Sequence, residues 1–209
     1  MESYRYIIAI AIICVLLYLY FEIDDKNQVV SQYDDRRYKT VKIFQDQHLA
    51  ADKLAYINEF IVKLMRYLRQ KYVYDERGTP QEIAFVKRLL NGYNPDIIQE
   101  NNPEGIKNTS YVYNKGEEIA FCLREKETGQ NKLHENHILE FVVLHEISHI
   151  ADIDMSADTH KNEFWAIFKF MLRNAKEAKL HEPIDYKRHP DNYCGLPIAY
   201  SPYYDPSVV

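Results

Sequence analysis

The sequence His145-Glu146-Ile147-Ser148-His149 places two imidazoles and a carboxylate inside a largely apolar stretch, residues 136–151. Apolar residues cover most of the circumference of a helix built from this stretch, which predicts a buried central helix. His145 and His149 lie on one helical face, one turn apart, because they are four residues apart. Burying Glu146 beside two imidazoles costs free energy unless these groups have partners. The fold therefore has to bury a helix and give these three side chains something to bind.

A metal ion is the partner that this spacing favours. Two histidines at positions i and i+4 of a helix can bind one zinc ion through Zn–N bonds of ~2.0–2.1 Å. Glu146 follows the first histidine, so it can reach a water molecule beside the metal, which is the general-base position of His-Glu-x-x-His peptidases. The alternative is an ordinary helix whose histidines bind other protein groups. We expect a Zn2+ site with His145 and His149 as ligands and Glu146 as the catalytic residue.

A zinc site that hydrolyses its substrate needs a third protein ligand and an open coordination position. The aspartates that follow His149 favour an end of the helix there, because Asp is a poor residue for a helix interior. His160 comes shortly afterwards, where a further helix is expected to begin. We expect His160 to be the third ligand, with Glu163, Asp152 and Asp158 as the alternatives.

Together with the segment His160-Lys161-Asn162-Glu163-Phe164-Trp165, the motif resembles the WLM/SprT-like zinc metallopeptidases. In that family the His-Glu-x-x-His helix is followed by a third histidine and then by a helix start that contains Phe or Trp. The resemblance also takes in the strands expected within 109–123 and the tail around Tyr193-Cys194-Gly195, which is similar to WLM-like proteins of large DNA viruses. It covers about residues 105–200.

The resemblance implies a zincin-like fold and hydrolysis of peptide bonds in a protein or peptide substrate. It implies that His145, His149 and His160 hold the zinc ion and that Glu146 is the general base. The link between the second and third histidines, residues 150–159, is longer here than in the family. Tyr193 is a separate candidate for stabilising an oxyanion, since a phenol can donate a hydrogen bond to developing negative charge.

The N-terminus carries an uncharged apolar run from Tyr6 to Phe21. As a helix this run would be about 24 Å long at ~1.5 Å per residue, and a spanning helix typically has roughly 17–25 residues. A cleaved signal peptide and a buried core helix are the alternatives. The small residues of a signal-peptidase site do not follow the run, which favours a retained anchor over a cleaved signal peptide. We expect residues 1–21 to be a retained single-pass membrane anchor that contacts the bilayer through 6–21. Arg5, before the run, predicts a non-cytoplasmic catalytic domain.

The rest of the chain is expected to form a polar stalk, 22–45, and one domain, 46–209. Helical spacing of apolar residues predicts a long amphipathic helix over 46–72. Thr79, Pro80 and Glu82 predict a capped helix start, and that helix is expected to end near Asn91-Gly92.

Residues 93–108 are expected to form a loop. Strands are predicted at 109–114 and 118–123, and helices at 136–151 and 161–178. The rest of the chain is rich in proline and is expected to be an extended tail.

Composition limits the other classes of function. The formal net charge is -5, which argues against a broad nucleic-acid surface, so no nucleic-acid partner is expected. The chain has 3 cysteines and no Cys-x-x-Cys pair, so a cysteine zinc site is not expected. Cys14 lies in the apolar run, whereas Cys122 and Cys194 either form a disulfide or remain two buried thiols.

These observations predict an α+β fold: a mostly helical zincin-like domain with a small β-sheet beside the 136–151 helix, plus an N-terminal transmembrane helix. The expected function is that of a membrane-anchored zinc metalloendopeptidase of viral type. The alternative is a non-catalytic, membrane-anchored structural or partner-binding protein that keeps zinc only for folding. A third hypothesis, a protease for DNA-linked proteins, would need a DNA-binding patch that the sequence does not show.

Overall fold

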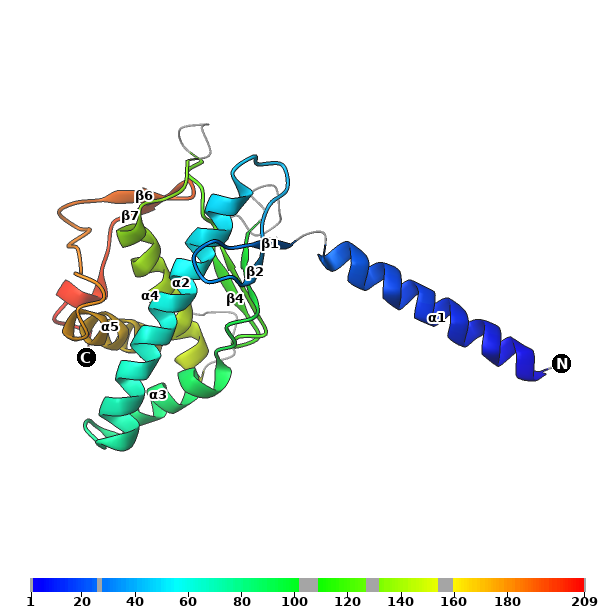
Figure 1. The fold of residues 1–209 in the computed structure, drawn as a ribbon. Helices are drawn as coiled ribbons and strands as arrows, with labels where there is room; N and C mark the ends of the chain where they lie inside the picture. Colours follow the sequence, from blue (N-terminus) through cyan, green and yellow to red (C-terminus); the bar gives the residue numbers. More distant parts are fainter. Residues whose placement is uncertain (1, 26–27, 102–108, 127–131, 154–159, 209) are drawn as a thin grey trace.

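The computed structural model describes residues 2–25, 28–101, 109–126, 132–153 and 160–208. Over these residues the chain is α+β, with five α-helices, one five-stranded sheet and one two-stranded sheet. All helices except the N-terminal one pack beside the larger sheet, and the C-terminal segment runs around these helices on the far side from that sheet (Figure 1).

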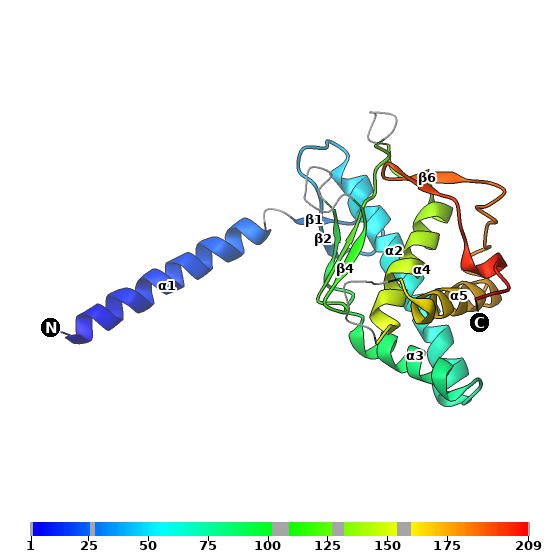
Figure 2. The ribbon, with the colours of Figure 1, turned by 180° about the vertical axis from the view of Figure 1, so that it is seen from behind.

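The N-terminal helix corrects the expectation of a membrane anchor. Helix α1 (Glu2–Asp25) forms where the apolar run predicts a helix, and it stands apart from the other elements in both views (Figures 1 and 2). Among the described residues, however, no helix is long and apolar enough to cross a membrane. The predicted transmembrane helix, and the membrane localisation based on it, are therefore wrong. The uncharged run from Tyr6 to Phe21 is shorter than the ~20 residues that span a bilayer, and charged residues flank it on both sides.

The main sheet has the strand order β1-β2-β3-β5-β4, with β2, β3 and β5 parallel and the outer strands antiparallel. Its strands are β1 (Gln28–Val30), β2 (Arg37–Lys39), β3 (Ile98–Glu100), β4 (Tyr111–Tyr113) and β5 (Glu118–Phe121). Two of these strands lie in the segment expected to be a stalk, and β3 lies in the segment expected to be a loop. Strands of three residues are too short to show an alternating pattern in the sequence. Strands β1, β2 and β3 therefore form because neighbouring strands pair with them.

Helices α2 (Gln47–Leu68) and α3 (Pro80–Gly92) connect β2 to β3. The apolar face of α2 is buried, and a π-helical turn, η1 (Arg69–Tyr74), continues it. The start of α3 is a capping box: the Thr79 hydroxyl accepts from the Glu82 backbone N–H, and the Glu82 carboxylate accepts from the Thr79 backbone N–H at 2.8 Å. The sequence therefore fixes this helix start locally.

Helix α4 (Asn136–Ala151) carries the His-Glu-x-x-His motif and is the centre of the fold. It contacts α2, α3 and α5 (Asn162–Glu177), as well as strand β4. Buried residues lie on all sides of α4, as its apolar circumference predicts. The motif is therefore held by a helix that is surrounded by packed neighbours.

The C-terminal segment contains a hairpin, β6 (Asp191–Tyr193) and β7 (Leu196–Ile198), followed by a short 3-10 helix, η2 (Pro202–Tyr204). Cys194 lies in the hairpin turn and forms a disulfide with Cys122, just after β5. The sequence allowed either a disulfide or two buried thiols, and the structure shows the disulfide. The disulfide joins the hairpin to the main sheet across 72 residues of chain.

Replacing Cys122 and Cys194 by Ala should lower the free energy of unfolding. Loop closure over 72 residues corresponds to about 4 kcal/mol by chain entropy. Urea denaturation of the oxidised protein and of the double variant measures the difference. Cys14→Ser is the matched control, because Cys14 is a free thiol on α1. Equal midpoints for the oxidised wild type and the double variant would contradict the expectation.

Candidate metal centre

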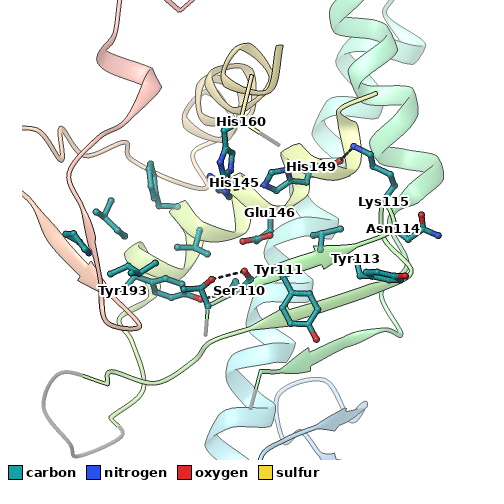
Figure 3. Close-up of a pocket in the computed structure, with 17 residues that line it drawn as sticks. Ser110, Tyr111, Tyr113, Asn114, Lys115, His145, Glu146, His149, His160 and Tyr193 are labelled. Carbon is teal, nitrogen blue, oxygen red and sulfur yellow. Dashed lines mark hydrogen bonds between the residues drawn. The ribbon is translucent and has the colours of Figure 1, made fainter. Parts of the chain in front are cut away.

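His145, His149 and His160 converge on one point although they come from two different elements (Figure 3). His145 and His149 lie in the last two turns of α4, and His160 lies just before α5. The Nε2 atom of His145 is 3.3 Å from Nε2 of His149 and 3.2 Å from Nε2 of His160. One ligand atom from each of the three residues lies within 4.8 Å of the others.

These separations fit a tetrahedral zinc site. Two nitrogen ligands bound to one zinc ion at ~2.0–2.1 Å are about 3.3 Å apart when the coordination is tetrahedral. The donor set, three imidazoles, is one that zinc prefers, and three protein ligands leave a position open. Three histidine side chains with such contacts therefore suit a zinc ion by chemistry as well as by distance.

The alternatives for the third ligand lie elsewhere. Glu163, in the first turn of α5, forms an ion pair with Arg88 of α3 at 3.7 Å. Asp152 is buried at the end of α4, and it is not part of the histidine cluster. Asp158 lies outside the described residues. Of the four residues considered for this role, the structure brings His160 to the pair on α4.

Two cations fix the C-terminal turn of α4, where His149 lies. The Nζ atom of Lys115 donates a hydrogen bond to the His149 carbonyl at 3.1 Å, and Arg88 Nε donates to the Ala151 carbonyl. Carbonyl groups in the last turn of a helix have no partner within it, and they carry the negative end of its dipole. These contacts therefore hold the motif's last turn in a fixed direction.

Gly116 explains how Lys115 comes so close to α4. Its φ angle is +112°, and a Cβ there would lie 2.3 Å from the carbonyl oxygen of Gly92 at the end of α3. Only glycine permits this approach of the β4–β5 turn to the end of α3. The turn is thereby placed beside Ile150 of α4.

Phe164 supports the three imidazoles from the side of α5. Its ring is stacked on His149 with centroids 4.3 Å apart, and it contacts the rings of His145 and His160 at 4.9 and 4.7 Å. The side chain is fully buried. Phe164 therefore couples the packing of α5 to the position of His160, in accord with the Phe- and Trp-containing helix start seen in the sequence.

Burial controls the protonation of the histidines in this cluster. Burial, followed by the nearby His149 and His160, lowers the pKa of His145 well below its ordinary value. Burial, His160 and Lys115 lower the pKa of His149 to about 4. Both imidazoles are therefore neutral at pH 7, the form that binds a metal.

Glu146 is buried, with 5% of its surface exposed, and it lines the same cleft as the histidines. Burial raises the pKa of its carboxyl group to about 8. Within the part of the chain that the structure describes, this carboxylate has no hydrogen-bond or ion-pair partner. Burying a carboxylate without a protein partner costs free energy unless a bound group interacts with it.

Glu146→Gln should stabilise the metal-free protein, and the gain should grow with pH. Folded wild-type protein keeps a proton on Glu146 between pH 4.5 and about 8, whereas the unfolded chain loses it above pH 4.5. Wild-type stability therefore falls as pH rises through this window. The difference between variant and wild type should be small at pH 5 and on the order of 5 kcal/mol at pH 9. Denaturation in the presence of a chelator at both values measures it. A difference that does not change with pH would contradict the burial of Glu146.

The histidines lie in a cleft of 690 Å³. One wall is β4 with the turn that follows it, and α4 forms the floor. The hairpin β6–β7 forms the wall at the other end. In Figure 3 the motif side chains lie between Tyr193 of the hairpin and Lys115 of the turn. The site is therefore open to a ligand that lies across the C-terminal half of α4.

Tyr193, the candidate for oxyanion stabilisation, does line this cleft. Its hydroxyl forms a hydrogen bond with the Ser110 hydroxyl, which also accepts from the Cys122 backbone N–H at 3.0 Å. Burial, together with the nearby Glu146, raises the pKa of the Tyr193 phenol, so it stays protonated. The phenol is thus held in place as a neutral hydrogen-bonding group beside Glu146.

Comparison with known proteins shows similarity to two viral proteins. The chain is 31% identical over 196 residues to the uncharacterized protein R325 of Acanthamoeba polyphaga mimivirus, a match that covers 92% of this chain and 94% of that protein. The chain belongs to the same family as this mimivirus protein. It is also 31% identical over 117 residues to the uncharacterized protein 136R of Invertebrate iridescent virus 6, covering 56% of this chain and 60% of that protein.

No protein-family model and no solved structure matches the chain. Both viral relatives are named as uncharacterized, so the geometry of the site carries the functional argument.

Sequence reasoning missed three contributors to this site. Ser110, Lys115 and the apolar residues of β7 all line the cleft. Gly195, which follows Cys194 between two short runs, was a usable sequence signal for a hairpin turn. In the structure both residues have positive φ. Ser110 and Lys115 carried no such signal, since only the packing of β4 against α4 brings them to the site.

Proposed function

We propose that this protein is a zinc-dependent metallopeptidase of the His-Glu-x-x-His type. The observation that carries the proposal is the convergence of His145, His149 and His160 at tetrahedral spacing, with Glu146 in the same open cleft. The resemblance of the motif and of the segment 160–165 to WLM/SprT-like metallopeptidases supports the same conclusion.

His145, His149 and His160 would hold the zinc ion through their Nε2 atoms. When bound, zinc supplies Lewis acidity, which polarises a carbonyl group and lowers the pKa of water to near 7. Beside a bound zinc ion, the pKa of the Glu146 carboxyl group would be lower than in the metal-free protein, so the group would be ionised. Glu146 would then accept a proton from the attacking water, whose oxygen bonds to the carbonyl carbon of the peptide. The C–N bond then breaks, and Glu146 delivers the proton to the leaving amine. The products are two peptides, and no covalent bond to the protein forms.

Tyr193 donates its phenolic hydrogen toward the oxygen on which negative charge develops. Ser110 holds this phenol in position through the hydrogen bond between the two hydroxyls. The substrate lies in the cleft as an extended chain along β4, the last strand in the sheet order. This arrangement brings a scissile carbonyl between Glu146 and Tyr193.

The second hypothesis is a non-catalytic protein that keeps zinc for folding. A structural zinc site is normally closed by four protein ligands. Within the described residues the cluster has three histidines, and it opens into a cleft of 690 Å³. A structural site also gains nothing from the buried carboxylate of Glu146. Both observations favour the peptidase over the structural protein.

Metal analysis and proteolysis together test the proposal. Purified full-length protein should contain about one zinc ion per chain and should cleave a reduced, alkylated and therefore unfolded protein. A chelator should abolish cleavage, and added zinc should restore it. Bound zinc without cleavage of any unfolded substrate would favour the structural hypothesis. Absence of zinc binding would overturn both hypotheses.

A further inference from the structure

The hairpin β6–β7 presents an apolar surface to the cleft. The cleft is lined here by Leu196, Pro197 and Ile198 of β7. Helix α4 adds Phe141 and Val142 to the same lining. Leu196 is 55% exposed, although it is a large aliphatic residue. Its side chain therefore contributes little to the core, and it is available to a ligand.

The hairpin is fixed in place at its turn. The Cys122–Cys194 disulfide joins it to the end of β5, and the Cys194 backbone N–H donates to Nε2 of buried His134 at 3.3 Å. The His134 ring also packs on Tyr193, with centroids 4.9 Å apart. An apolar wall that is held this way presents a surface of constant shape, which lowers the entropic cost of binding.

The two ends of the cleft differ in chemistry. At the hairpin end, three residues from β7 and two from α4 are apolar, and Tyr193 adds a hydroxyl that is bonded to Ser110. Lys115 and Asn114 lie at the opposite end, in the turn after β4 (Figure 3). A charged substrate side chain placed at the hairpin end would lose hydration and gain no partner. A large apolar side chain would bury surface against Leu196 and Ile198.

We infer that the β6–β7 hairpin selects substrates with a large aliphatic or aromatic side chain close to the scissile bond, and that Leu196 sets this preference. The inference rests on the proposed peptidase function. The side chain in question lies near the scissile bond because Tyr193, on the same hairpin, lines the cleft together with Glu146. An apolar pocket commonly discriminates between side chains by about 10- to 200-fold.

The first test measures binding and does not require turnover. Fluorescently labelled extended peptides, identical except for Leu or Asp at one central position, are titrated into zinc-loaded Glu146→Gln protein. The Leu peptide should bind at least about 10-fold more tightly. In Glu146→Gln/Leu196→Lys protein the Asp peptide should bind more tightly than the Leu peptide. The lysine attracts the aspartate, and it no longer offers the leucine an apolar surface. Equal affinity for both peptides in Glu146→Gln protein would overturn the inference.

The second test measures cleavage of a peptide library by zinc-loaded wild-type protein. Leu, Ile, Met or Phe should be enriched at one position next to the cut bond, and Leu196→Lys should shift that position toward Asp and Glu. Leu49→Lys is the matched control, since Leu49 is an equally exposed leucine on α2 outside the cleft. It should keep the wild-type profile.

The outcomes separate the two proposals. Cleavage without preference at any position, or an unchanged profile in Leu196→Lys, refutes the role of the hairpin and leaves the peptidase proposal standing. If wild-type protein cuts no peptide while Glu146→Gln still binds the Leu peptide more tightly, the peptidase proposal fails and the apolar selectivity of the hairpin holds.

Discussion

Glu146→Gln should lower peptide turnover by at least ~100-fold, the usual scale for a lost general base, and should leave zinc bound. Glutamine has nearly the same shape as glutamate, but it cannot accept the proton of the attacking water. The metal should remain, because the three histidines hold it and Glu146 is not part of their cluster. Initial rates on an unfolded protein substrate, measured together with the zinc content of each preparation, provide the comparison.

Glu163→Gln is the control for this variant. It makes the same chemical change at a carboxylate near the site that is paired with Arg88. Its turnover should stay within a few-fold of wild type, since Glu163 takes no part in the proposed proton transfer. Equal turnover by Glu146→Gln and wild-type protein would exclude Glu146 as the base. A parallel loss of zinc would instead show that Glu146 supports the metal site.

His160→Ala should weaken zinc binding by at least about 100-fold, more than the loss of an outer-shell partner usually costs. Two imidazoles from α4 leave the ion with too few protein ligands, and His160 supplies the third nitrogen at tetrahedral spacing. Competition with a chromogenic zinc chelator measures the affinity. Activity should fall with zinc occupancy, and excess zinc should restore it only in part.

His137→Ala and Glu163→Ala are the matched controls for the third ligand. His137 is a half-exposed histidine near the start of α4, and it lies 3.6 Å from Asp191 on β6. Glu163 was the other candidate ligand close to His160 in the sequence. Neither substitution should change the zinc affinity by more than a few-fold. A large loss in Glu163→Ala with little effect in His160→Ala would reverse the assignment of the third ligand.

The sequence by itself predicted the parts of this protein that depend on local spacing. The four-residue separation of His145 and His149 places them on one face of any helix, and apolar residues around most of the circumference indicate that the helix is buried. The capping box at Thr79 and Glu82 likewise needs only neighbouring residues. The prediction of a membrane anchor from the N-terminal run was wrong, because the run is uncharged but slightly short of the length that spans a bilayer.

Tertiary structure alone decided what surrounds the motif. Strands β1, β2 and β3, of three residues each, are too short to show a pattern in the sequence, so pairing across the sheet determines them. The approach of His160 to His145 depends on how α5 packs through Phe164, which no spacing in the sequence fixes. The disulfide between Cys122 and Cys194 brings the β6–β7 hairpin to the cleft from 72 residues away. Contacts between segments that are distant in the sequence form when the whole chain buries its apolar surface, and no local pattern encodes them. The hairpin wall of the cleft therefore could not be predicted from the sequence, whereas the central helix α4 could.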